Sequence, residues 1–123
     1  MISFESFTKN DNSPVYLQIV KFIKQGIVSG VIKNGDKLPS RRELSAQIKV
    51  NPSTVQKAYT VLEEDYLIES PTCAKSTMVL DEDTIVRVEE ELKGDDIREI
   101  ISSLKRMGVT KDEAKELLER NWE

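Results

Sequence analysis

Two signals for the start of a helix lie close together in the middle of the chain. Ser40 and Glu43 have the spacing of a capping box, in which each side chain accepts a hydrogen bond from the other residue's backbone amide. Asn51 and Pro52 follow, and they suit the N-cap and the first position of another helix. The interval holds one helix of about eight residues and a turn of about four, which is typical of a helix-turn-helix.

Apolar side chains on both sides of these signals repeat with helical periodicity. They predict a first helix over roughly residues 14–29, with Pro14 in its first turn and Gly30 just beyond its end. Leu44 and Ile48 form the buried side of the second helix. The third helix turns four side chains towards the core, namely Val55, Ala58, Tyr59 and Leu62. The pattern therefore predicts three helices with buried faces.

Two short strand-like runs follow the third helix, over residues 66–70 and 76–80. The turn between them contains Lys75 and Cys73, whose thiol we interpret as incidental. A β-hairpin directly behind a helix-turn-helix is a wing. We therefore predict a mainly α (α+β) fold in which residues 1–80 form a winged helix-turn-helix domain.

The rest of the chain is helical in pattern as well. A long helix runs from Asp81 to Arg106, with Gly94 at a five-residue step where the helix either kinks or breaks. Gly108 closes this helix, and Thr110 begins a last one. Four side chains form an apolar strip that buries little without a partner: Ile97, Ile100, Ile101 and Leu104. We expect residues 81–123 to form a small helical dimerisation segment with this strip at the interface of a homodimer.

Composition limits the chemistry available to the chain. No residue is histidine and only one is cysteine, which excludes Ser–His and Cys–His nucleophile pairs, His metal ligands and an intrachain disulfide. We expect no enzymatic activity, no metal and no cofactor. No apolar run approaches the roughly 18 residues of a membrane helix, and no signal peptide opens the chain. We therefore expect a soluble, cytoplasmic protein without a membrane partner.

The net charge of −4 hides a contrast between the two parts of the chain. Residues 1–80 carry ten basic and eight acidic side chains, whereas residues 81–123 carry eight basic and fourteen acidic ones. An anionic partner would therefore meet the front part of the chain.

Side chains that can contact DNA gather at the two helix starts. The third helix directs Ser53, Gln56, Lys57 and Thr60 outward. Thr54 lies with the first three of these in the first two turns, and the apolar Pro52 can touch a thymine methyl group. A recognition helix enters the major groove with its N-terminus first, where glutamine can read adenine and Ser/Thr can donate to bases or phosphates. Arg41 and Arg42 can hold phosphate or reach a guanine edge, and Lys75 can touch the DNA backbone. The alternative for each of these residues is an ordinary solvated surface.

Residues 14–79 resemble the winged-helix domain of the GntR family of bacterial transcription regulators. Three motifs carry the resemblance: PVYLQI over residues 14–19, LPSRREL over 38–44 and VNPSTVQKAY over 50–59. With about forty residues behind the wing, the chain looks like the short YtrA-type subfamily. The resemblance implies an operator-binding homodimer joined through its C-terminal helices. It also implies DNA contacts at Arg42 and, around the recognition helix, at Pro52, Ser53, Thr54, Gln56 and Lys57.

The wing departs from the family pattern of Gly-x-Gly-Thr-Phe-Val. Neither glycine is present here, and a tip without glycine cannot approach the phosphate backbone as closely. In place of the family's usual glycine after the recognition helix stands Asp65.

Our hypothesis is a sequence-specific transcriptional regulator, a repressor, that binds a palindromic operator in double-stranded DNA as a homodimer. Two alternatives stay open. One is a winged-helix protein-interaction module without DNA binding, which the acidic total and the atypical wing favour. The other is a regulator gated by a small-molecule effector, although no group of residues identifies one. An enzyme would have to rely on carboxylates or lysine, and no paired arrangement of these is readable.

Overall fold

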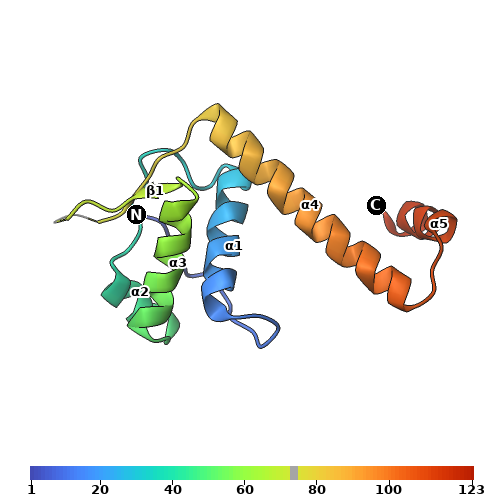
Figure 1. Cartoon of the computed structure of the whole chain (residues 1–123), viewed down its shortest axis with the longest axis horizontal. Coiled ribbons are helices and arrows are strands. Elements are labelled where there is room, and N and C mark those ends of the chain that lie inside the picture. Colours follow the sequence, from blue (N-terminus) through green and yellow to red (C-terminus); the bar gives the residue numbers. More distant parts are fainter. Residues whose placement is uncertain (73–74) are drawn as a thin grey trace. The chain divides into compact units, whose positions relative to one another are not determined.

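The computed structural model describes residues 1–72 and 75–123 (Figure 1). The expected turn thiol, Cys73, lies outside the described residues. The elements in chain order are α1 (Val15–Ser29), α2 (Arg41–Ile48), α3 (Pro52–Glu64), β1 (Ile68–Glu69), β2 (Thr77–Met78), α4 (Glu82–Arg106) and α5 (Lys111–Asn121). The contacts divide the chain into unit 1, Met1–Glu89, and unit 2, Glu90–Glu123. The predicted mainly α fold with a small sheet is confirmed.

Unit 1 is built around α3, against which both α1 and α2 pack (Figure 1). The four inward positions predicted for α3 are all buried, and so are Leu44 of α2 and Ile23 of α1. The N-terminal residues also enter this core, because Ile2 and Phe4 are buried against it. Periodic apolar positions therefore place α3 at the centre of the unit, with its outer face open.

The helix starts are largely as the sequence predicts. Ser40 and Glu43 form the complete capping box of α2, with both hydrogen bonds at 3.1 Å. Asn51 is at the N-cap of α3, but its side chain makes no capping hydrogen bond. Pro14 precedes α1 as its N-cap instead of lying in its first turn, while Gly30 ends α1 with a left-handed φ of 83°.

The wing is shorter than the sequence predicts. Ile68 pairs with Met78, and Glu69 with Thr77, in an antiparallel two-residue ladder. An isolated bridge from Lys37 to Thr77 adds a third extended piece on the other side of β2. The hairpin therefore closes against the segment that leads into α2.

The expectation that Tyr66 begins a strand is wrong. Its φ is 60°, and its side chain is 83% exposed, because the chain turns sharply there between α3 and β1. Asp65, at φ −81°, has an ordinary backbone conformation and needs no glycine. The left-handed position that favours glycine is thus one residue later than the sequence comparison suggests.

The helix α4 does not break at Gly94, which lies inside a continuous helix from Glu82 to Arg106. The helix ends at Arg106, and in the turn that follows Gly108 has a φ of 74° and the amide of Val109 donates to the carbonyl of Leu104 at 3.1 Å. Thr110 then caps α5 by accepting a hydrogen bond from Glu113 N at 3.3 Å. Among the residues the structure describes, no helix is long and apolar enough to cross a membrane.

Candidate nucleic-acid interface

The outer face of α3 presents the predicted contact residues together. Pro52, Ser53, Gln56 and Lys57 are exposed, and Thr54 is half-buried. The side-chain amide of Gln56 donates to the hydroxyl of Thr60 at 3.1 Å, and that hydroxyl donates to the backbone carbonyl of Gln56 at 2.9 Å. These bonds align the Gln56 side chain along the helix surface, where its amide can meet a base edge.

Lys57 is held in place by a residue from another helix. Its ammonium lies 4.3 Å from the ring centroid of Tyr16 on α1, a cation–π contact. Sequence reasoning missed Tyr16, which is 41 positions away in the chain and belongs to the PVYLQI motif. The position of the Lys57 charge is therefore set by packing between α1 and α3.

The two neighbouring arginines at the start of α2 have different surroundings. Arg42 is exposed, whereas Arg41 is half-buried with its guanidinium 5.3 Å from the ring centroid of Tyr59. The Nε atom of Arg41 is enclosed and has no hydrogen-bond partner. The Tyr59 hydroxyl donates to the carbonyl of Pro39 at 2.7 Å, and burial raises the pKa of this hydroxyl well above its usual range. Arg42 is thus exposed on the surface, while Arg41 also packs on Tyr59.

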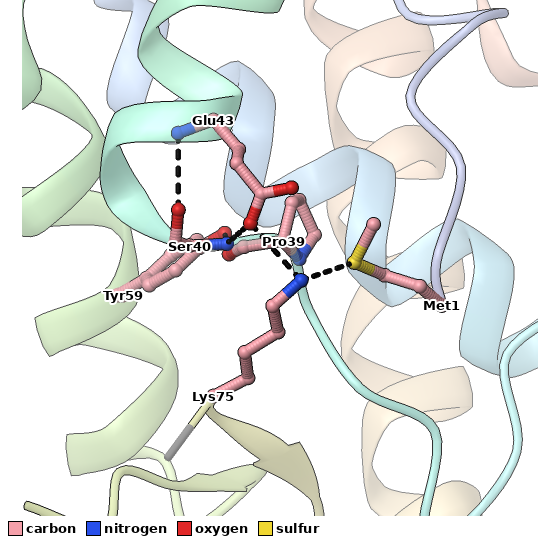
Figure 2. Close-up of polar contacts among 6 residues, drawn as sticks. All are labelled: Met1, Pro39, Ser40, Glu43, Tyr59 and Lys75. Carbon is pink, nitrogen blue, oxygen red and sulfur yellow. Dashed lines mark hydrogen bonds and ion pairs between the residues drawn. The ribbon is translucent and has the colours of Figure 1, made fainter. Parts of the chain in front are cut away.

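Lys75 of the hairpin folds back onto the start of α2 (Figure 2). Its ammonium lies 3.0 Å from Oε1 of Glu43 and 3.2 Å from the sulfur of Met1. The wing lysine therefore ties the hairpin, the capping box and the N-terminus together. Lys75 and Arg41 both line a hollow of about 380 Å³, whose other lining residues are Pro39, Ser40, Tyr59, Thr72 and Ser76.

The Lys75–Glu43 ion pair is expected to affect the pKa of the Glu43 carboxyl. The hydrogen bond from Lys75, followed by those from the backbone and side chain of Ser40, lowers the pKa of the Glu43 carboxyl. We expect Lys75→Met to raise this pKa towards its ordinary value, as measured by an NMR titration of the carboxyl carbon. Lys33→Met removes an exposed lysine elsewhere and serves as the control.

The direction of the pH effect follows from the lowered pKa. The contribution of Glu43 to stability is complete above the ordinary carboxyl pKa, and it disappears as the pH falls through the lowered value. If the pKa of Glu43 is the same in Lys75→Met as in the wild type, Lys75 is not the main cause of the lowered pKa.

Unit 2 leaves its predicted apolar strip uncovered. Ile97, Ile100 and Ile101 are 45%, 46% and 43% exposed, and Leu104 is half-buried. All residues of unit 2 are described, and none of them is fully buried. Trp122, which sequence reasoning did not single out, is 78% exposed near the end of the chain. The unit therefore has no apolar core of its own.

Unit 1 is a helix-turn-helix followed by a wing, and the open face of its second helix carries amide, hydroxyl and basic side chains. This combination is typical of one class of proteins, the winged-helix regulators that bind DNA. The model of the family "Bacterial regulatory proteins, gntR family" matches residues 15–72. The uncharacterized HTH-type transcriptional regulator YhcF of Bacillus subtilis is 36% identical over 83% of this chain and 84% of its own. The chain belongs to the GntR family of transcriptional regulators and carries its DNA-binding helix-turn-helix.

The short YtrA-type resemblance is confirmed by a further relative. The HTH-type transcriptional repressor YtrA of Bacillus subtilis is 40% identical over 67% of this chain and 68% of its own. Among solved structures, a GntR family transcriptional regulator from Listeria monocytogenes has a TM-score of 0.78 at 32% identity, covering 91% of this chain and 98% of its own. The DNA-binding domain of AraR, solved in complex with operator ORX1, has a TM-score of 0.52 at 26% identity, covering 59% and 93%.

Proposed function

We propose that this chain represses transcription by binding a palindromic operator in double-stranded DNA as a homodimer. The observation that carries the proposal is the open face of α3, where Gln56 and Lys57 lie beside the exposed first turn of the helix. Arg42 is exposed at the start of the neighbouring α2. Amide and hydroxyl groups can read base edges there, while the cations neutralise phosphates.

Two similar proteins support the repressor role and the operator in this proposal. One relative is named a repressor, and the DNA-binding domain of AraR has been solved on an operator. Residues 1–80 would be the DNA-binding domain, acting in the cytoplasm through binding and not through catalysis. Nothing among the described residues identifies an effector, and a group of His, Cys, Asp or Glu that could hold a metal is not found among them.

The dimer is supported by the uncovered strip on α4. An apolar face of this kind, in a unit without its own core, is stabilised when a second copy covers it. We propose that residues 81–123 form this dimerisation segment. A two-fold dimer presents two recognition helices to a palindrome, with half-sites about 34 Å apart for each helical turn of DNA.

Fluorescence anisotropy tests the proposed function on the duplex upstream of this chain's own gene, with a scrambled duplex as the control. We expect two chains per duplex and binding to the native duplex roughly 10³-fold tighter or more than to the scrambled one. Affinity for both should fall as salt rises, because phosphate contacts release counterions.

Equal binding of the two duplexes would contradict sequence-specific recognition of this site. Absence of binding to either duplex at low salt would instead favour the protein-interaction module.

A further inference from the structure

The N-terminal segment, residues 1–13, is anchored to the core at its beginning. The amide of Ile2 donates to the carbonyl of Lys37 at 2.8 Å, and Phe4 is buried. The ring of Phe4 stacks on that of Phe22 in α1, with 5.0 Å between centroids, and Phe7 meets the same ring edge-on at 5.4 Å. The segment therefore has a fixed path over α1.

A second anchor follows a few residues later. The side-chain amide of Gln18 on α1 accepts from the Asn10 amide at 2.9 Å. It also donates to the carbonyls of Asn10 and Ser13, at 2.9 and 2.6 Å. Lys9 lies between this anchor and Phe7, so its backbone is fixed on both sides.

From this position the ammonium of Lys9 reaches the end of α2. It donates to the carbonyl of Ile48 at 3.1 Å and to that of Lys49 at 2.8 Å. Carbonyls at the C-terminus of a helix lack partners within the helix, and a cation is favoured there. Lys49 has a left-handed φ of 57°, which is unfavourable for a residue with a Cβ atom. The turn before α3 thus depends on contacts from outside it.

Ser45 holds the remainder of this turn. Its hydroxyl donates to the carbonyl of Val50 at 2.6 Å, and the Val50 amide donates to the Ser45 carbonyl at 3.1 Å. Three successive carbonyls, from Ile48 to Val50, each accept a side-chain hydrogen bond. Asn51 follows as the N-cap of α3 and makes no side-chain capping bond. The start of α3 is therefore placed by the turn and not by its own cap.

We propose that Lys9 is a positioning residue of the DNA interface, whose two hydrogen bonds fix the turn so that α3 meets the bases in one register. It acts through Pro52, Ser53 and Thr54, which directly follow the turn. This inference rests on the proposed operator binding, because register matters only where α3 reads bases.

Three variants separate positioning from charge. Lys9→Met removes the ammonium and keeps the aliphatic stem, whereas Lys9→Arg keeps a cation that can donate to both carbonyls. Lys49→Met removes an exposed cation from the same turn and leaves the Lys9 bonds in place.

Two measurements are made on each variant. The first is hydrogen exchange of the backbone amides of residues 49–51, 53 and 54 in the DNA-free protein. The second is the ratio of affinities for the operator and for an operator with one changed base pair under α3.

In Lys9→Met we expect the backbone amides of residues 49–51, 53 and 54 to exchange roughly tenfold faster, and those of α1 to exchange at the wild-type rate. In the wild type, one mismatched base pair typically lowers the affinity tenfold or more. In Lys9→Met, the ratio of the affinities for the operator and for the changed operator should be roughly threefold smaller than in the wild type. Lys9→Arg should restore both values. Lys49→Met should weaken binding to both duplexes alike and leave the ratio and the exchange rates unchanged.

Wild-type exchange rates in Lys9→Met would overturn the proposal, and so would an unchanged affinity ratio. If the wild-type protein itself does not distinguish the duplexes, the proposed function fails. The exchange rates in the DNA-free protein still decide in that case whether Lys9 holds the turn.

Discussion

Arg42→Ala and Gln56→Ala are each expected to weaken operator binding by about 1–3 kcal/mol. A side chain that contacts a base edge through two hydrogen bonds usually contributes about this much to the free energy of binding. Both side chains are exposed, so truncating them removes no core packing. Gln56→Ala should also relax the base preference at one position of each half-site. Anisotropy titrations of the operator and of its single-base variants measure both effects.

Arg120→Ala is the matched control, because it removes an exposed arginine from α5 and leaves unit 1 unchanged. Arg41→Ala is a less suitable test, since Arg41 also packs on Tyr59 and its loss changes the core. If Arg42→Ala and Gln56→Ala both bind the operator as tightly as the wild type, the assignment of these contacts is wrong.

Ile101→Asp is expected to convert the proposed homodimer into monomers. A carboxylate in the middle of the apolar strip would be buried without a partner, and an unpaired buried charge costs about 3–5 kcal/mol. The dissociation constant of the dimer should therefore rise by about a hundredfold or more. Light scattering coupled to size-exclusion chromatography measures the mass at several concentrations.

Ser102→Asp is the control for this second prediction. It introduces the same charge one position along α4, where the helical period turns the side chain away from the strip. A dimer that persists in Ile101→Asp would refute the strip as the interface, and monomers in both variants would point to a general effect of charge on α4.

The sequence predicted those features of the fold and the site that depend on neighbouring positions. The spacing of Ser40 and Glu43 gave the start of α2, and Asn51 with Pro52 gave the start of α3. The period of 3.6 residues separated the buried Tyr59 from the exposed Gln56. These signals are reliable because hydrogen bonds within a helix and burial of one face act over three or four residues.

Gly94 and Tyr66 mark the limit of such local signals. A glycine in a helical pattern is compatible with either a break or a continuous helix, and here α4 continues through it. Tyr66 has strong strand propensity, yet the reversal between α3 and β1 imposes a positive φ on it. Both outcomes depend on how the ends of the elements pack.

The sequence by itself thus determined the helix-turn-helix, the wing and the outward face of α3. Only the tertiary structure decided which distant side chains meet around these elements: Lys9 bonds the turn before α3, Tyr16 contacts Lys57, and Glu43 pairs with Lys75. The partners in these contacts are between 32 and 41 positions apart. No periodicity relates residues so distant, because their meeting is fixed by the packing of the whole core and not by the local path of the backbone.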